Sequence, residues 1–299
     1  MTNTIDPGVC AVCSAQKWRV AYEGPIRHGT FGNSVEATVF QCDVCGVKFL
    51  PSSVGLAPNY YAGPEYRETV GEEADAEDFF RRHDAEQLDR YPLMNRVSLR
   101  DRIVAEVGCA AGSFLDGVRG FASTTIGVEP ALAYHESLRQ RGHAAFSDLS
   151  HACVEWRGKV DVAVCFSVIE HVAQPVAFLR QIKTLLVPGG QLLVSTPNAR
   201  DILLEVGSEA YRRFFYRSVH AYYFDAPSLR TAAGIAGFSR FEPRYVHRFN
   251  FANFIGWLDQ EKPSGNARAT VLGDRFDRTW KAELEESGHA DYLYAWLAD

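Results

Sequence analysis

The sequence lacks the features that direct a chain into or across a membrane. No run of about 18 consecutive apolar residues occurs, so no membrane-spanning helix is predicted. The first ten residues, MTNTIDPGVC, lack the basic and apolar regions of a secretory signal peptide. We therefore expect a cytoplasmic protein with no membrane partner.

The chain also lacks an excess of positive charge. Its 299 residues have a formal net charge of -6 and a pI of about 5.9. A strongly basic field that would collect phosphates is therefore absent, which makes a nucleic-acid partner unlikely. Apolar residues make up 46% of the chain and charged residues 23%, as is typical of a globular protein that folds unaided. Monomer and homodimer are equally compatible with this composition.

The seven cysteines are not expected to form a disulfide scaffold, because an odd number without an export signal favours reduced thiols. Four of them form two C-x-x-C pairs separated by 28 residues, namely Cys10, Cys13, Cys42 and Cys45. Two such turns provide the four sulfur ligands of a closed tetrahedral zinc site, whose role is structural. We predict a small zinc ribbon with strands near 18–23 and 36–41. A redox C-x-x-C is the alternative, but no βαβ unit follows either pair.

From residue 101, short apolar runs alternate with amphipathic segments, which predicts an α/β fold with a parallel sheet. Strands are expected at 102–108, 124–130, 143–149, 159–168 and 191–198, with helices at 112–121, 131–142 and 174–190. Further along, the pattern predicts helices at 227–238 and 267–287 and strands at 239–248 and 291–298. Before the sheet, 51–70 is predicted to be an irregular connector and 71–98 helical.

The first predicted strand continues into a glycine-containing loop, E-V-G-C-A-A-G-S-F, from Glu106 to Phe114. Gly108 and Gly112 allow the backbone to approach a ligand, and the free amides of the next helix suit a carboxylate or phosphate. Glu129, at the end of the second strand, can bind both hydroxyls of a ribose. This arrangement would also suit NAD, but the loop is not the G-x-G-x-x-G fingerprint.

The ordered segments EVGCAAGSF, GVEP, SDL, DVAVCFSVIEHV and LLVPGGQLLVSTPN resemble those of class I S-adenosylmethionine-dependent methyltransferases. The chain is most similar to the ubiquinone-biosynthesis-like group, especially sugar and natural-product methyltransferases with an N-terminal zinc-binding C-x-x-C module. The resemblance implies a Rossmann-like seven-stranded sheet with an antiparallel last strand, here 291–298. It divides the chain into a zinc ribbon (1–52), a linker and helical cap over cofactor or substrate (53–100), and the methyltransferase domain (101–299).

The resemblance also assigns cofactor-binding residues. The loop after the first strand would hold the methionine part of S-adenosylmethionine, Glu129 the ribose, and Asp148 the adenine amino group, with three further residues lining the pocket. The full set is Glu106, Gly108, Cys109, Ala110, Gly112, Glu129, Asp148, Leu149, Phe166 and Ser167. Asp148 could instead cap a helix, and Cys109 is more simply a small filler than a nucleophile.

Candidate bases follow the fourth and fifth strands, and they are Glu170, His171, His220 and Tyr222. Related O-methyltransferases carry an ExxEH metal motif where this chain has Ser167 to His171, and the serine replaces the first glutamate, which argues against a catalytic metal. A helix cap at Glu170 and His171, and an aromatic lid around His220, are the structural alternatives. Tyr60, Tyr61 and Tyr66 resemble a tyrosine-rich segment that covers the cofactor in related enzymes, although plain packing explains them equally well.

These features predict methyl transfer by direct displacement, with assistance from a base, to a sugar, a nucleotide-sugar or a secondary metabolite in natural product biosynthesis. An RNA methyltransferase is the main alternative, in which the zinc ribbon would grip RNA through Lys17, Arg19, Arg27 and Lys48. A third possibility is a binding protein that kept the cofactor fold and lost the chemistry, against which the intact Glu129 and Asp148 argue.

Overall fold

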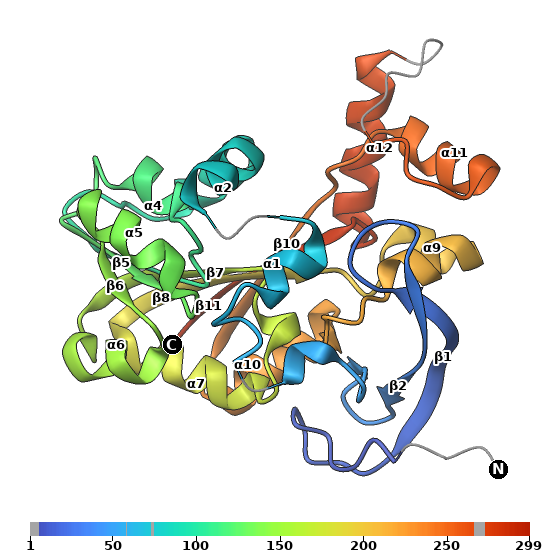
Figure 1. Cartoon of the computed structure of the whole chain (residues 1–299), viewed down its shortest axis with the longest axis horizontal. Helices are drawn as coiled ribbons and strands as arrows, with labels where there is room; N and C mark the ends of the chain where they lie inside the picture. Colours follow the sequence, from blue (N-terminus) through green and yellow to red (C-terminus); the bar gives the residue numbers. More distant parts are fainter. Residues whose placement is uncertain (1–5, 58, 73–74, 266–272) are drawn as a thin grey trace.

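The computed structural model describes residues 6–57, 59–72, 75–265 and 273–299. Its main body is a seven-stranded sheet with helices on both faces, and a smaller four-stranded sheet lies beside it (Figure 1). Among the described helices, none combines the length and the apolar character that crossing a membrane requires.

The large sheet has the strand order β10-β11-β8-β7-β4-β5-β6. Its strands are β4 (Ile103–Val107), β5 (Thr124–Val128), β6 (Ala144–Phe146), β7 (Val160–Phe166), β8 (Leu186–Pro197), β10 (Arg240–Val246) and β11 (Tyr292–Ala298). Neighbouring strands in the run β8-β7-β4-β5-β6 pair in parallel, whereas β11 runs antiparallel to both of its neighbours, β10 and β8. The predicted Rossmann-like sheet with an antiparallel last strand is therefore confirmed.

Helices cover both faces of this sheet, which is why its strands are apolar on both sides. In β4, Val104 packs into one apolar cluster and Ala105 into the opposite one. The cluster around Ala105 is covered by α6 (Leu149–Trp156), α7 (Pro175–Leu185) and α10 (Ala226–Ala236). The cluster around Val104 is covered by α4 (Ser113–Val118) and α5 (His135–Gln140), with aromatic residues of 76–94 above them.

The smaller sheet has the order β1-β2-β3-β9 and combines two distant parts of the chain. A long antiparallel hairpin of β1 (Trp18–Arg27) and β2 (Ser34–Cys42) continues into β3 (Lys48–Phe49), which pairs with β9 (Tyr222–Tyr223). We call residues 6–50 the N-terminal module. Its buried cysteines belong to the same apolar cluster as α7 and α10, so the module packs directly on the main body.

Four helices in the second half of the chain border the sheet edge near the N-terminal module. They are α8 (Ile202–Glu205), α9 (Glu209–Phe215), α11 (Phe251–Gln260) and α12 (Asp274–Ser287). A third apolar cluster joins Ile26 of β1 to Tyr216, Tyr223 and Trp257. Figure 1 shows α9 beside β1, with α11 and α12 projecting from the same side of the molecule.

Several sequence predictions differ from the structure before the sheet. The connector at 51–70 contains a helix, α1 (Glu65–Val70), which Gly71 ends with a φ of 77°. The helix predicted over 71–98 is broken into α2 (Ala76–His83) and α3 (Gln87–Arg90), linked and followed by 3₁₀ turns. Pro92 lies in the last turn, where it removes a backbone donor that a continuous α-helix would use.

Two later predictions also need correction. The helix predicted over 174–190 ends at Leu185, because Leu186 already pairs with Val160 and the Pro-Gly-Gly segment lies inside β8. Of the helix predicted over 267–287, the structure shows α12 from Asp274, while 267–272 lie outside the described residues. Helices α6, α8, α9 and α11 were not predicted.

Asn198, directly after β8, is a buried polar residue whose loss should be costly. Its side-chain amide donates to the carbonyls of Gly288 (3.0 Å) and Ala290 (2.8 Å), and its oxygen accepts from Arg200 N (3.1 Å). We expect Asn198→Ala to lower the free energy of unfolding by about 2–4 kcal/mol, because three backbone groups lose their partner. Urea denaturation measures this, with the exposed Asn33→Ala as control. A loss no larger than that of the control would contradict the prediction.

Candidate functional site

A cavity of about 840 Å³ opens at the carboxyl ends of the parallel strands. Residues that end or directly follow β4, β5, β7 and β8 form its floor, and these are 106–110, 128–131, 166–168 and 197. The order of the sheet reverses between β4 and β7, and open α/β sheets bind ligands at such a point. Other lining residues come from 61–90 and from the segments around α9, α11 and β11.

The loop after β4 has a backbone that favours glycine. Gly108 has a φ of 79°, and a Cβ built there would lie 2.3 Å from Cγ2 of Val168. Gly112 has a φ of 92°, and its Cβ would lie 2.6 Å from Cδ2 of Leu138. Gly108, Cys109 and Ala110 line the cavity, whereas Gly112 is not part of its lining. Because Gly108 has no side chain, its main chain forms part of the cavity surface. Gly112 lies outside the lining and is the N-cap of α4.

Glu106, at the end of β4, is a buried carboxyl group with spare hydrogen-bonding capacity. Its side chain lines the cavity and the residue is only 4% exposed. Within the described residues, Oε2 of Glu106 has no hydrogen-bond partner. Burial raises the pKa of Glu106 to about 8, against the opposing effect of the Arg90 cation.

Glu129, at the end of β5, is held by main-chain amides. Its two carboxyl oxygens accept hydrogen bonds from Ala110 N and Ala131 N, both at 2.9 Å. Burial raises its pKa, while these two amides act in the opposite direction. The carboxylate is thus fixed in the cavity wall with lone pairs left to accept further bonds.

Asp148 caps α6, as the structural alternative proposed, and it also lines the cavity. Its carboxylate accepts from His151 N at 3.0 Å and from Ser150 Oγ at 2.5 Å. Leu149, Phe166 and Ser167 line the cavity as well. Cys109 is buried, and burial raises the pKa of its thiol well above the ordinary value, so it is an inert filler of the loop.

His171 lines the cavity and lies in the 3₁₀ turn that follows β7. Its Nδ1 is 2.9 Å from the carbonyl oxygen of Val219 and 2.8 Å from the hydroxyl of Tyr61. Since a carbonyl can only accept, this contact assigns the proton to Nδ1 and leaves the lone pair on Nε2. Burial lowers the pKa of His171 to about 4, so the ring is neutral at pH 7.

Two more candidate bases adjoin His171. The His220 ring meets the His171 ring edge-on, with centroids 4.7 Å apart, and the buried Nδ1 of His220 has no partner within the described residues. Burial lowers the pKa of His220 well below its usual value, and a positive charge on His171 would lower it further. Burial raises the pKa of Glu170 to about 8. One carboxylate oxygen of Glu170 and one ring nitrogen each of His171 and His220 all lie within 4.8 Å of one another.

The structure does not bring Tyr222 to this group. Tyr222 is buried in β9, its ring is stacked on Phe49 at 5.0 Å, and its hydroxyl donates to the carbonyl of Ala173. Tyr61 and Tyr66 both line the cavity beside His171, with ring centroids 5.4 and 5.8 Å from it.

The second half of the cavity was not predicted from the sequence. It is lined by aromatic and charged residues of β1, α9 and α11 and of the loops that flank α8, α9, α11 and β11, which include Arg27, Asp201, Tyr211, Phe214, Arg217, Arg248, Phe254, Trp257 and Asp291. The sequence offers one signal for this half, the aromatic and basic composition of 212–224, which suits a ringed or anionic ligand.

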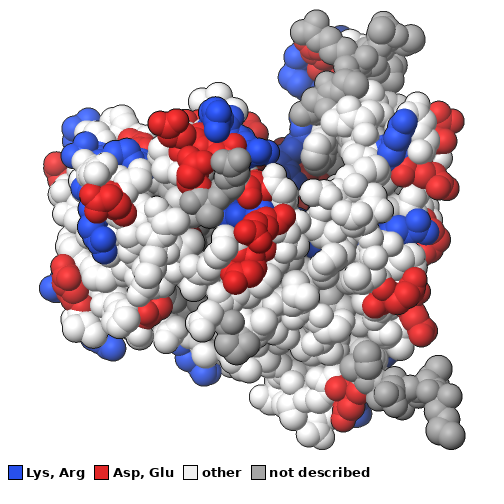
Figure 2. All heavy atoms as spheres, viewed as in Figure 1, with Lys and Arg blue, Asp and Glu red and all other residues white. Residues whose placement is uncertain are grey.

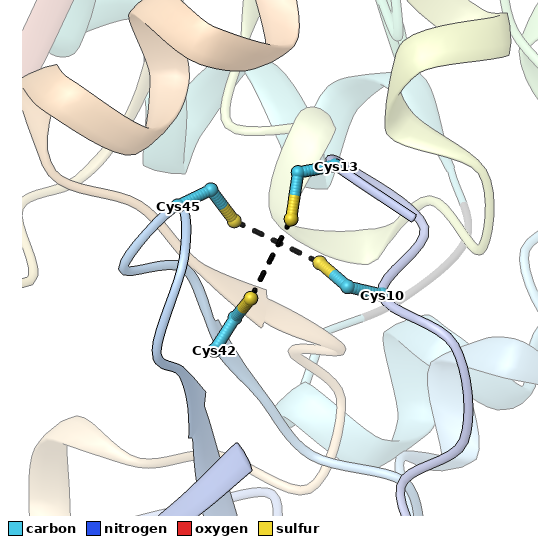
Figure 3. A group of neighbouring side chains, drawn as sticks. All are labelled: Cys10, Cys13, Cys42 and Cys45. Atoms are coloured by element: carbon cyan, nitrogen blue, oxygen red, sulfur yellow. Dashed lines mark hydrogen bonds between the residues drawn. The ribbon is translucent and has the colours of Figure 1, made fainter. Parts of the chain in front are cut away.

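Four thiol groups converge at one end of the N-terminal module (Figure 3). The sulfurs of Cys10 and Cys45 are 3.7 Å apart, and those of Cys13 and Cys42 are 3.5 Å apart. A tetrahedral ion with Zn–S bonds of about 2.3 Å places sulfurs about 3.8 Å apart. The donor set and its spacing therefore fit a closed four-sulfur metal site.

The cations considered for RNA binding do not form a shared surface. Arg19 pairs with Asp43, Lys48 donates to the carbonyl of Ala199, and Arg27 lines the cavity, which leaves Lys17 exposed. On the face drawn in Figure 2, basic and acidic side chains lie interspersed along the upper part and the edges, and much of the lower centre is uncharged.

Comparisons with known proteins agree with this geometry. The profile of the methyltransferase-domain family matches residues 80–240. The chain is 32% identical over 137 residues to a ubiquinone biosynthesis O-methyltransferase of Xanthomonas campestris, covering 42% of this chain and 57% of the relative. A Paraburkholderia phytofirmans protein of the same name is 28% identical over 156 residues, covering 45% and 67%. The chain thus spans little more than half the length of the first of these relatives.

Among solved structures, the fold resembles a SAM-dependent methyltransferase from Archaeoglobus fulgidus, with a TM-score of 0.51 at 13% sequence identity. That match covers 78% of this chain and 98% of the other. The family profile covers more than half of the chain, and the sheet, its antiparallel strand and the cavity at the strand ends agree with it. The chain belongs to the methyltransferase-domain family and has the fold of S-adenosylmethionine-dependent methyltransferases.

Proposed function

We propose that this chain transfers a methyl group from S-adenosylmethionine to a small-molecule acceptor. The observation that carries the proposal is a single cavity in which acidic strand ends, a neutral histidine and an aromatic, basic half adjoin one another. Bound S-adenosylmethionine would supply an electrophilic methyl group. The residues of this chain would bind it, orient the acceptor and accept a proton.

The strand ends suit the polar groups of this cofactor. Oε2 of Glu106, buried and without a partner among the described residues, fits the cofactor's ammonium group. Glu129, fixed between two amides, fits the ribose hydroxyls, and Asp148 with Leu149 the adenine. Phe166, Ser167 and the loop 108–110 would complete the contact surface. These assignments extend the family resemblance to the positions where the cavity offers the matching chemistry.

His171 is the residue best arranged to accept a proton from the acceptor. Its Nε2 bears the lone pair, and contacts from Val219 and Tyr61 at Nδ1 fix the orientation of the ring. His220 packs against it and Glu170 adjoins both, so we assign them a supporting role. We propose that the described residues of 53–100 form a cap that excludes water, because Tyr61, Tyr66 and several residues between them and Arg90, such as Arg67 and Phe79, line the same cavity.

The acceptor class that we favour is a sugar, a nucleotide-sugar or a secondary metabolite. The curated relatives are named as enzymes of ubiquinone biosynthesis, which supports a small molecule with a hydroxyl group. Aromatic side chains in the second half of the cavity, among them Phe214, Phe254 and Trp257, suit a ring.

We further propose that the four cysteines of the N-terminal module bind one structural zinc ion. The sulfur spacing fits it, and all four coordination positions would be filled by protein. The ion would stabilise the base of the β1–β2 hairpin and of β3, and so hold this module against β9.

Binding of S-adenosylhomocysteine at pH 7 is expected to release about one proton. The pKa of Glu106 is about 8, so its carboxyl group is mostly protonated at pH 7 and ionises when an ammonium group pairs with it. Calorimetry in buffers of different ionisation enthalpy measures this release. The release should fade as the pH rises above 8, where the group is already ionised.

Glu106→Gln should abolish the proton release and weaken binding at least about tenfold. Glu77→Gln, at an exposed position of α2, is the matched control and should change neither. Equal proton release from wild type and Glu106→Gln would contradict the role of Glu106. A wild-type chain that does not bind S-adenosylhomocysteine would contradict the proposed function itself.

Methyl transfer from labelled S-adenosylmethionine should occur to small molecules and not to RNA. A panel of sugars, nucleotide-sugars and phenols is compared with total tRNA and rRNA. For the best acceptor, His171→Gln should lower kcat by about 10²–10⁴-fold through loss of the base, with little change in S-adenosylhomocysteine affinity. Transfer to RNA alone would overturn the proposed acceptor class, and full activity of His171→Gln would overturn the base.

The purified chain should contain one zinc ion per molecule, which elemental analysis by inductively coupled plasma mass spectrometry measures. Cys42→Ala should lose the ion and lower the free energy of unfolding, because the remaining sulfurs cannot close the site. Cys153→Ala, which removes a buried thiol outside the cluster, should keep the ion. A metal-free wild type with unchanged stability would contradict the proposed zinc site.

A further inference from the structure

The arginines that line the cavity fall into two groups. Three of the five are paired with carboxylates: Arg67 with Glu72 at 2.6 Å, Arg90 with Glu86 at 3.3 Å and Arg248 with Asp291 at 2.7 Å. Arg27 and Arg217 form no ion pair with any described residue. These two guanidinium groups therefore face the cavity without a counter-charge.

Backbone pairing holds the two arginines side by side although they are far apart in the sequence. Arg27, the last residue of β1, forms a parallel bridge with Arg217. Arg27 N donates to Tyr216 O at 3.0 Å, and Ser218 N donates to Arg27 O at 3.0 Å. The Tyr223 hydroxyl accepts from Arg217 N at 2.8 Å and donates to Arg217 O at 3.0 Å. The positions of both residues are thus fixed before any ligand binds.

The environment makes this pair of charges costly without a ligand. Burial, followed by the charge of Arg217, lowers the pKa of Arg27 to about 9. Its buried Nε has no partner among the described residues, and its guanidinium lies 4.0 Å from the centroid of the Phe214 ring. The carboxyl group of Asp201, which lines the same cavity, is already engaged by the Tyr211 hydroxyl. Buried cations without a partner are unfavourable, and ligand sites are where proteins keep them.

The pair also lies within electrostatic reach of the candidate base. Burial lowers the pKa of His171, the hydrogen bond to the Val219 carbonyl opposes this, and the charge of Arg217 lowers the pKa further. It acts in the same direction on His220. Because Arg27, Arg217 and His171 line one cavity, a ligand held by the arginines is in the same space as the candidate base.

We propose that Arg27 and Arg217 bind a phosphoryl group of the acceptor, an inference that rests on the proposed function. Guanidinium groups bind phosphoryl oxygens in a forked geometry. Two guanidinium cations match the two negative charges of a phosphoryl group better than they match the single charge of a carboxylate. Because Arg27 comes from β1, the N-terminal module supplies part of the acceptor site. The acceptor would then be a phosphorylated small molecule, with its reacting group placed at His171.

The test uses the full metal-loaded chain saturated with S-adenosylhomocysteine and titrated with inorganic pyrophosphate. Wild type should bind pyrophosphate, and Arg27→Gln and Arg217→Gln should each weaken binding at least about tenfold. Arg213→Gln, at an exposed arginine of α9, is the matched control and should bind as wild type does. Arg27→Lys, which keeps the charge but not the fork, should retain part of the affinity. Equal pyrophosphate affinity in all variants would overturn the proposal.

Two further arms make the outcome specific. Inorganic phosphate should bind more tightly than acetate, and equal binding of the two would overturn the assignment to a phosphoryl group. S-adenosylhomocysteine affinity, measured for every variant, shows that the cofactor half is intact and that lost anion binding is not unfolding. If wild type bound pyrophosphate through both arginines but not S-adenosylhomocysteine, the proposed function would fail while the anion site stood.

Discussion

Backbone pairing between the N-terminal module and residues 216–223 determines how the second half of the cavity is built. β3 pairs with β9, Arg27 bridges Arg217, and the Tyr223 hydroxyl bonds both main-chain groups of Arg217. The strand pairs join main chain to main chain, and the Tyr223 side chain contacts only main-chain groups of Arg217, so the backbone positions of this region are set by few side-chain contacts. The module is consequently a wall of the site, and anything that stabilises it, such as a metal at its four cysteines, also orders the acceptor half.

Among the described residues, the two halves of the cavity leave different groups without partners, a carboxyl group in one and two guanidinium cations in the other. At the strand ends, Oε2 of Glu106 lacks a partner within the described chain, whereas Arg27 and Arg217 lack a counter-charge at the far side. Each unsatisfied group lowers stability in the free protein and becomes favourable when a ligand supplies the missing partner. In the proposed arrangement, the strand ends would bind an ammonium-bearing molecule and the region beside Phe214 and Arg217 an anionic one, with His171 lining the same cavity.

How far the sequence could predict this site depended on how local each feature is. Glu106, Gly108 and Glu129 were predicted because strand, loop and helix follow one another in a short segment. The Arg27–Arg217 pair could not be, since only tertiary pairing of distant segments brings it together. Pro188 and the glycines after it suggested a helix end at 190, but the pairing of Leu186 with Val160 extended β8 instead. Helix α11 was missed because nothing local distinguishes its aromatic run from a core strand.

The direction of the cationic side chains in the N-terminal module bears on whether the acceptor is a small molecule or RNA. Of its cations considered for RNA, Arg19 is engaged by Asp43 and Lys48 by a carbonyl, and solvent-exposed charges such as Lys17 contribute little once salt screens them. Arg27 instead faces the cavity interior, where the dielectric is lower and an anion is bound more strongly. Phe214 and Trp257 line the same cavity as Arg27, so the proposed phosphorylated acceptor would be bound among them. The position of this one side chain therefore favours a small-molecule site over an RNA-binding surface for the N-terminal module.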